Sequence, residues 1–257
     1  MQLIIPAYNE EARLPETLRA LRAYALSPRV VPGRPLEVIV VDNASTDGTA
    51  LVAAAADSPA MRVRVVHCPV RGKGAAVAAG VAVTTADVVG FMDADGATAL
   101  VAFADAAVLL AQGVDVAIGS RAVAGAVTSE RHSRARAFGA RAYRSLAGRI
   151  VPGVLDTQCG FKLMGGDLAR VVFADIATTG FSFDVEVLAR ARTLGARIAE
   201  FPVHWVDVPG STFSPVRHGL DSFCALAVIA WRVRRPVRTP VTLPVRTPAA
   251  LELAAEG

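Results

Sequence analysis

The first half of the chain alternates short apolar runs with longer segments whose apolar residues recur at helical spacing. Such runs are typical of buried strands, and they cover residues 3–6, 36–41, 62–67, 87–92 and 114–120. The segments between them predict helices. The first of these is expected to be capped by Asn9, with Glu10 and Glu11 in its first turn. This alternation predicts an α/β fold in which a mainly parallel sheet is flanked by helices on both faces.

The second half of the chain is less regular. Helices are predicted over residues 131–149, 183–194 and 215–235, a polar turn over 156–162 and a strand over 199–206. The helix over 131–149 contains six arginines.

The C-terminal segment is rich in proline, which is excluded from helix and sheet interiors. The unit Pro-Val-Arg-Thr-Pro occurs at 236–240 and again at 244–248, which predicts an extended or disordered tail. We therefore expect a globular domain over residues 1–214, an amphipathic helix over 215–235 and a flexible tail over 236–257.

Composition narrows the class of protein. The chain has 257 residues, 27 basic and 23 acidic side chains, and 53% hydrophobic residues, so it is too apolar to be disordered as a whole. Its three cysteines form no CxxC pair, which argues against a disulfide framework or a zinc knuckle. The apolar stretch over 222–231 is far shorter than the ~20 residues of a membrane span. Residues 1–5 lack the features of a signal peptide, so a cytoplasmic protein is expected.

Polar clusters follow four of the predicted strands, at residues 6–10, 42–48, 71–74 and 93–96. Ligands of parallel sheets bind beyond the carboxyl ends of the strands. The clusters therefore predict a ligand site at this edge of the sheet.

Two of these clusters carry carboxylates. Asp93 and Asp95 can face one divalent cation whose oxygen shell a diphosphate completes, with a solvated turn as the alternative. Asp42 ends its strand, where it can accept hydrogen bonds from a base or a ribose. Thr46 and Asp47 are expected to cap the helix that follows.

The remaining clusters keep alternatives open. The turn over 6–10 either presents Tyr8 to a nucleobase or simply starts a helix. The segment over 71–74, Arg-Gly-Lys-Gly, resembles a phosphate cradle but lacks the Walker spacing, which excludes ATP hydrolysis of that type. The arginines of 131–149 form a solvated face, a nucleic-acid patch or a phosphate site. The modest net charge of +4 disfavours nucleic acid.

In their order along the chain, these pieces resemble glycosyltransferase family 2, which has the Rossmann-like GT-A fold. Within it they are most similar to the polyprenyl-phosphate glycosyltransferases of the dolichyl-phosphate glucosyltransferase type. The resemblance covers residues 3–215, and its most specific piece is Asp-Thr-Gln-Cys-Gly-Phe-Lys at 156–162. The other matching pieces are 6–10, 41–49, 72–76, 93–98, 119–121, 183–186 and 203–205.

The resemblance implies roles for residues at these positions. The nucleotide would be held by Pro6, Tyr8, Asn9, Glu10, Asp42 and Lys73. The cation on the diphosphate, Mg²⁺ or Mn²⁺, would be bound by Asp93 and Asp95. The acceptor phosphate would be bound by Arg121, Arg131 and Arg134, with Arg136 as an alternative in the same helix. The substrate would also contact Asp156, Gln158, Trp205 and Ser211.

The activity implied is inverting transfer of a hexose from a nucleotide sugar, UDP-glucose by default, to a polyprenyl phosphate. A phosphate monoester is largely dianionic at pH 7 and needs cations to position it rather than a base. A hydroxyl acceptor would need a carboxylate base, for which Asp156 and Asp184 are candidates. Two alternatives stay open: a soluble family 2 transferase with a small hydroxyl or phosphate acceptor, and a non-catalytic protein that binds sugar nucleotides.

Two departures from the family concern the acceptor. Thr212 stands where many relatives carry a lysine, and the usual C-terminal membrane helices are missing. A lipid acceptor requires a membrane surface, and the helix over 215–235 has an apolar middle and a basic end. This helix either lies in the membrane interface, which would make the protein peripheral on the cytoplasmic face, or packs on the domain or in a dimer.

Overall fold

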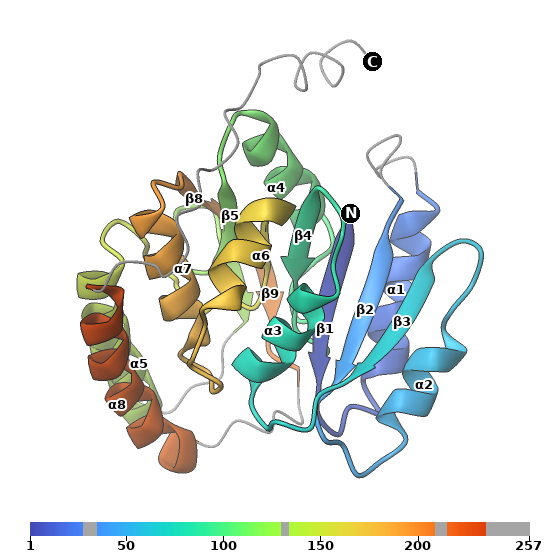
Figure 1. Ribbon diagram of the computed structural model, residues 1–257, viewed down its shortest axis with the longest axis horizontal. Coiled ribbons are helices and arrows are strands. Elements are labelled where there is room, and N and C mark those ends of the chain that lie inside the picture. Colours follow the sequence, from blue (N-terminus) through green and yellow to red (C-terminus); the bar gives the residue numbers. More distant parts are fainter. Residues whose placement is uncertain (28–34, 130–133, 209–214, 235–257) are drawn as a thin grey trace.

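The computed structural model describes residues 1–27, 35–129, 134–208 and 215–234, and it has the α/β architecture predicted from the sequence (Figure 1). Seven strands form one sheet in the order β3-β2-β1-β4-β7-β5-β8. Their bounds are β1 Gln2–Ala7, β2 Glu37–Asp42, β3 Arg62–His67, β4 Val88–Phe91, β5 Val116–Ser120, β7 Lys162–Gly165 and β8 Ile198–Pro202. Only β7 runs against its two neighbours, β4 and β5, so the sheet is mainly parallel as expected.

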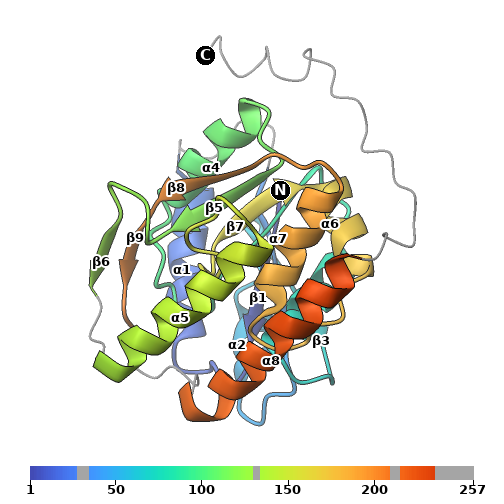
Figure 2. The ribbon, with the colours of Figure 1, turned by 90° about the vertical axis from the view of Figure 1, so that its left-hand side faces the viewer.

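Helices cover both faces of the sheet (Figures 1 and 2). Their bounds are α1 Leu14–Ala25, α2 Thr49–Ala55, α3 Lys73–Ala82, α4 Ala102–Ala111, α5 Arg134–Ile150, α6 Gly166–Ala174, α7 Phe183–Thr193 and α8 Pro215–Val233. Successive residues of β1 point to opposite faces, so Leu3 and Ile5 pack with α1 and α4 while Ile4 packs with α3, α6 and α7. The helices α5 and α8 lie side by side and pack on α7 (Figure 2).

The strand predicted over 199–206 is in fact two strands. β8 stays in the main sheet, whereas β9 (His204–Val206) pairs in parallel with β6 (Val127–Ser129) in a small second sheet. The chain leaves the main sheet at Pro202, which has no N–H to donate. Trp205, in β9, bridges to Thr98 and lies beside Arg121, the residue that follows β5.

The first helix begins later than predicted, and Asn9 does not cap it. α1 starts at Leu14 with Pro15 in its first turn, and no side chain caps its N-terminus. Asn9 instead has a φ of 54°, and its Oδ1 accepts a hydrogen bond from the N–H of Thr46 in a neighbouring loop. The capping prediction was wrong because this side chain joins two loops rather than holding its own helix.

The second half contains the predicted helices, present as α5, α7 and α8, as well as elements that the pattern did not predict. β7 and α6 were missed, because Lys162 looked like the end of a polar turn when it is the buried first residue of a strand. The C-terminal helix was expected and is present as α8, with Leu226 and Ile229 buried in the core. In the described part of the chain, no helix has the length and apolarity to cross a membrane. The predicted tail lies outside the described residues.

Candidate active site

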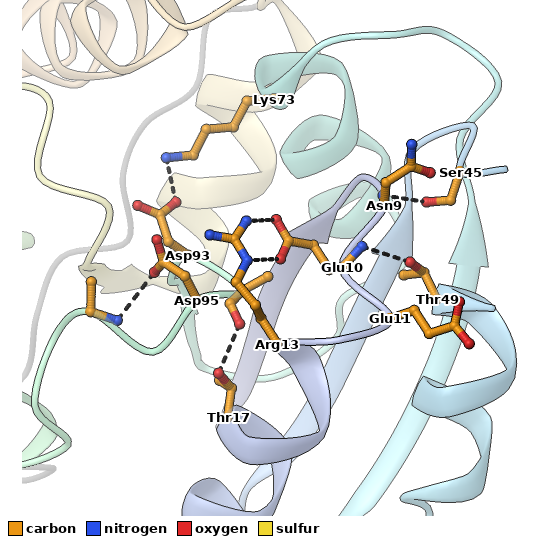
Figure 3. Close-up of polar contacts among 12 residues, drawn as sticks. Asn9, Glu10, Glu11, Arg13, Thr17, Ser45, Thr49, Lys73, Asp93 and Asp95 are labelled. Carbon is orange, nitrogen blue, oxygen red and sulfur yellow. Dashed lines mark hydrogen bonds and ion pairs between the residues drawn. The ribbon is translucent and has the colours of Figure 1, made fainter. Parts of the chain in front are cut away.

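The loops that follow β1 and β2 are joined at the carboxyl edge of the sheet (Figure 3). The N–H of Glu10 donates to Oγ1 of Thr49 at 2.8 Å, and the N–H of Asn9 donates to Oγ of Ser45 at 3.1 Å. In the same region, the Arg71 guanidinium lies over the ring of Tyr8, 5.6 Å from its centroid. Three of the four polar clusters predicted from the sequence therefore meet.

Asp42 lies where expected, at the end of β2, and is buried. Its Oδ1 accepts a hydrogen bond from the Ser45 N–H at 3.2 Å, and its Oδ2 lies 3.1 Å from Nδ1 of His67. Asp47 accepts a hydrogen bond from the N–H of Thr49, so it holds the start of α2 from just before the capping position. Thr46 does not cap this helix: the capping position is Gly48, and the Thr46 hydroxyl donates to Oδ1 of Asn9 at 3.4 Å.

Asp93 and Asp95 lie together beyond the end of β4 (Figure 3). Nζ of Lys73 lies 2.5 Å from Oδ1 of Asp93, and Oδ1 of Asp95 accepts a hydrogen bond from the Ala97 N–H at 3.1 Å. Burial opposes the charge on Asp93, but the Lys73 ammonium keeps the pKa of this carboxyl below its usual value. The pKa of Asp95 is raised by burial and by the neighbouring charge of Asp93. A negative charge on Asp95 is therefore less favourable here than in water, and a cation bound beside it would stabilise that charge.

Glu10 is bound by a residue that the sequence did not single out. Nε and Nη2 of Arg13 donate to the two carboxylate oxygens of Glu10, at 2.7 and 2.5 Å. Burial raises the pKa of Glu10, and Arg13 opposes this rise. Nη1 of Arg13 is buried and has no hydrogen-bond partner. The spacing Glu-x-x-Arg was the available signal, but it looked like an ordinary surface pair at a helix start.

A second cluster lies beyond the end of β5. Arg121 donates three hydrogen bonds to the Asp156 carboxylate, from its N–H, Nε and Nη2, at 3.0, 2.7 and 3.0 Å. Its guanidinium also lies over the Trp205 ring, 5.4 Å from the centroid. Burial opposes the charge on Asp156, but the bonds from Arg121 keep the pKa of this carboxyl below its usual value. Three of the residues predicted from the resemblance thus lie together.

Glu200, on β8, holds this second cluster and was not predicted. Its carboxylate accepts hydrogen bonds from the N–H groups of Leu155 and Asp156, at 2.7 and 2.8 Å. Gln158 lies on the same loop and uses its side-chain amide to donate to Oη of Tyr143 and to the carbonyl of Phe181. The loop over 154–161 is therefore held from both sides.

The cluster around Asp93 and the cluster around Asp156 meet at Gly160. A Cβ atom at this position would lie 2.0 Å from Oδ2 of Asp93, so only glycine lets the loop pass this close to the carboxylate. Behind the loop, Nζ of the fully buried Lys162 donates to the carbonyl of Cys159 at 2.7 Å and lies 2.5 Å from Oδ1 of Asp184. The buried ion pair therefore fixes the loop against Asp93.

Four residues named from the sequence cannot be placed in the same way. Arg131 and Ser211 lie outside the described residues. Arg134 and Arg136 belong to the first turn of α5, where the structure describes the helix but not these two side chains.

The carboxylates at the end of β4 fit a hard divalent cation. Their oxygens are the ligands that Mg²⁺ and Mn²⁺ prefer. Among the described residues, no group of three or more His, Cys, Asp or Glu side chains is arranged to hold a metal. The protein would therefore supply two carboxylates here, and a bound diphosphate and water would complete the shell.

Comparison with known proteins identifies the class of site. Residues 2–166 match the family model described as "Glycosyl transferase family 2". The chain belongs to this family. It is also 34% identical to a dolichyl-phosphate beta-glucosyltransferase of Drosophila melanogaster, over 91% of this chain and 77% of the relative. A mouse protein of the same name is 34% identical over 91% of this chain and 78% of its own length.

A solved structure confirms the fold of this glycosyltransferase. Glucosyl-3-phosphoglycerate synthase from Mycobacterium tuberculosis superposes with a TM-score of 0.64 at 22% identity, covering 91% of this chain and 80% of the other. That structure contains Mn²⁺ and UDP, and another structure of the same enzyme contains Mg²⁺ and UDP. With the family established, the chain is a nucleotide-sugar-dependent hexosyltransferase similar to the dolichyl-phosphate glucosyltransferases. The alternative of a non-catalytic protein is therefore wrong.

Replacing Gly160 with alanine is expected to damage the active site. The added methyl group would overlap Asp93, so either the loop or the carboxylate must move, and overpacking of this kind costs about 1–3 kcal/mol. We expect turnover to fall at least ~10-fold, because the shift displaces reacting groups. Steady-state kinetics and urea unfolding measure the two effects. In the control, Gly148→Ala on α5, the added Cβ meets open space, and equal losses in both variants would contradict the expected contact.

Acid should weaken the contribution of Asp156 to stability. The folded-state pKa of Asp156 is lowered from 3.8, so its ionised form stabilises the fold above that pH. This stabilisation is lost as the pH falls through the lower, folded-state pKa. We expect the gap in unfolding free energy between the protein and Asp156→Asn to shrink from about pH 5 to about pH 3. Urea unfolding at both pH values measures the gap, and a constant or growing gap would contradict this expectation.

Proposed function

We propose that this glycosyltransferase moves glucose, with inversion, from UDP-glucose to a polyprenyl phosphate and that it uses Mg²⁺ or Mn²⁺. The observation that carries the proposal is that both candidate base carboxylates are paired with cations, Asp156 with Arg121 and Asp184 with Lys162. A hydroxyl acceptor needs a carboxylate that can take its proton, whereas a phosphate dianion needs none. The names of the fly and mouse relatives support the same sugar and acceptor.

The donor would lie along the loops after β1, β2 and β4. Tyr8 and Asp42 would contact the nucleoside, with Pro6, Asn9 and Glu10 shaping the turn. Asp93 and Asp95 would hold the cation, and Lys73 lies beside Asp93. A divalent cation bound there supplies the positive charge that stabilises the departing diphosphate.

The acceptor would lie on the Arg121 side of the site. The Arg121 guanidinium is already oriented by Asp156 and by the Trp205 ring, and such a planar fork suits phosphate oxygens. Arg131 and Arg134 would supply further positive charge to the acceptor, and Gln158 and Ser211 would border the sugar. An acceptor oxygen would then bond to the anomeric carbon as the bond to the diphosphate breaks on the opposite side. Inversion follows from this single displacement, and no proton has to be removed.

Assays with paired donors and acceptors test this proposal. UDP-glucose and GDP-mannose are each offered with a short-chain prenyl phosphate, a water-soluble alcohol and phosphoglyceric acid, with Mn²⁺ or with EDTA. We expect glucosyl prenyl phosphate as the main product, made only with the metal and detected by mass spectrometry. Faster transfer to the alcohol or to phosphoglyceric acid would favour a soluble transferase with a small acceptor.

A lipid acceptor also predicts attachment of the protein to membranes through α8. This helix buries Leu226 and Ile229 but leaves Val228 and Trp231 half exposed, at 50% and 55%, so it packs on the domain and still presents an apolar surface. We expect flotation with anionic liposomes to recover the protein, and recovery to fall at least ~3-fold in Val228→Ser/Trp231→Ser, because burial of apolar surface and a basic end drive interfacial binding.

The matched control for flotation changes an exposed apolar residue elsewhere. Leu51 on α2 is 77% exposed, and Leu51→Ser should float like the unchanged protein. Equal recovery of all three forms, or no recovery of any, would exclude a membrane role for α8.

A further inference from the structure

Lys73 follows a loop that is held at the candidate active site by hydrogen bonds and by close packing. The N–H of Gly72 donates to Oδ1 of Asn43 at 2.8 Å, and the Asn43 amide donates in turn to the carbonyls of Cys68 and Val70. Gly72 has a φ of 130°, and a Cβ atom there would lie 2.2 Å from the carbonyl oxygen of Thr179. These contacts hold the backbone next to Lys73 in place, whereas its long side chain has rotatable bonds through which the ammonium can move.

The carboxylate that Lys73 binds is also held in place. Oδ1 of Asp93 lies 2.5 Å from the Lys73 ammonium, and its Oδ2 faces Gly160 so closely that a Cβ atom there would lie 2.0 Å away. Asp93 thus has the Lys73 ammonium on one oxygen (Figure 3) and the backbone of Gly160 against the other. A metal ion that approaches Asp93 meets a positive charge already in place, and two cations on one carboxylate repel each other.

We propose that Lys73 is an internal counter-ion that holds Asp93 until the donor arrives, and that the donor diphosphate draws the ammonium away and so opens Asp93 to the metal. This inference rests on the metal-dependent donor site of the proposed function. Without a donor, a divalent cation competes with Lys73 for Asp93 and binds weakly. With a donor, the phosphate oxygens offer the ammonium a new partner. Metal and donor then bind cooperatively, and each tightens the other by the same factor.

The geometry explains why a lysine suits this position. Its flexible stem carries a compact charge that can move from a carboxylate to a nearby phosphate without a change in the backbone. The side chain of Lys73 is 16% exposed and that of Asp93 is 38% exposed, so a diphosphate can reach the pair from solvent. Lys162 and Asp184, by contrast, are 0% and 2% exposed and form a permanent pair behind the loop.

Binding of Mn²⁺ without any sugar transfer tests the proposal. Electron paramagnetic resonance measures free Mn²⁺ in titrations of the unchanged protein, Lys73→Met and Lys73→Arg, each with and without UDP. Without UDP, we expect Lys73→Met to bind Mn²⁺ about 10-fold more tightly than the unchanged protein, whereas Lys73→Arg, which keeps the charge, should bind no more tightly. We also expect UDP to tighten Mn²⁺ binding by a smaller factor in Lys73→Met than in the unchanged protein.

Several outcomes would overturn the proposal. A gain below ~3-fold in Lys73→Met, or an undiminished effect of UDP, would mean that Lys73 does not compete with the metal. A gain that persists in Lys73→Met/Asp95→Asn would place the new Mn²⁺ site elsewhere. Circular dichroism checks each fold, and Lys73→Gln replaces Lys73→Met if that variant does not fold. Because no acceptor is present, these titrations can succeed even if transfer to a prenyl phosphate fails.

Discussion

Asp95→Asn is expected to lower turnover by about three orders of magnitude while leaving the fold intact. The pKa of Asp95 is raised by burial and by the nearby charge of Asp93, so its ionised form is held less favourably in the folded protein than in the unfolded chain. Removing that charge should therefore not reduce stability at pH 7. In the proposed metal site it would remove one of the two protein ligands of the cation. A bound cation would stabilise the leaving group by several kcal/mol, and each 1.36 kcal/mol is tenfold in rate.

Two measurements separate this loss from unfolding. Turnover is measured with saturating UDP-glucose and Mn²⁺, and the free energy of unfolding is measured in urea. Asp105→Asn is the control, because Asp105 is exposed on α4 and should retain full activity and stability. Turnover of Asp95→Asn within ~10-fold of the unchanged protein would argue against a cation held at this position.

Arg121→Ala is expected to lose both activity and stability. The Asp156 side chain is 4% exposed and receives three hydrogen bonds from Arg121, of which the two from the side chain would be lost. An unpaired buried carboxylate costs about 3–5 kcal/mol. Turnover should fall at least ~100-fold as well, because loss of a positioned charge costs ~2.7 kcal/mol or more. Arg121→Lys keeps the charge but loses the planar fork. Its turnover and its stability should therefore lie between those of Arg121→Ala and those of the unchanged protein.

A double-variant cycle separates the ion pair from other effects. If Arg121 acts on stability through Asp156, then Arg121→Ala/Asp156→Ala loses less stability than the two single variants together. Arg144→Ala is the control for the loss of an arginine side chain as such, since Arg144 is exposed on α5. Strict additivity would show that the pair does not act as a unit, and full turnover in Arg121→Ala would remove this residue from the acceptor site.

Hydrophobic patterning predicted the first half of the fold closely and the second half less well. Strands that follow one another in a parallel sheet, such as β1 and β2, are uniform apolar runs that read clearly from the sequence. β7 could not be recognised from the sequence, because it begins with Lys162. This charged residue is buried in a pair with Asp184, which lies on the helix α7. The division between β8 and β9 was also missed, since it depends on which neighbouring strand each segment meets.

The residues of the site were easier to predict than their contacts. Asp93, Asp95, Arg121 and Asp156 could be named because strand ends and family motifs mark them. That Arg121 binds Asp156, or that Lys73 binds Asp93, depends on loops that are far apart in the chain. Glu200 was missed because a lone glutamate in an edge strand resembles a solvated surface residue. Its role becomes visible only in the structure, where its carboxylate accepts hydrogen bonds from two backbone N–H groups.

The most direct test compares two acceptors that differ only in the head group. A short-chain prenyl phosphate and the prenyl alcohol of the same chain are offered at equal concentration with UDP-glucose and Mn²⁺, and glucosylated product is measured by mass spectrometry. If cations position an acceptor that is already ionised, the phosphate is glucosylated and the alcohol reacts at least ~100-fold more slowly, since both candidate bases, Asp156 and Asp184, are paired with cations and so are poorly suited to take its proton. Equal rates, or a faster reaction of the alcohol, would contradict the proposed mechanism.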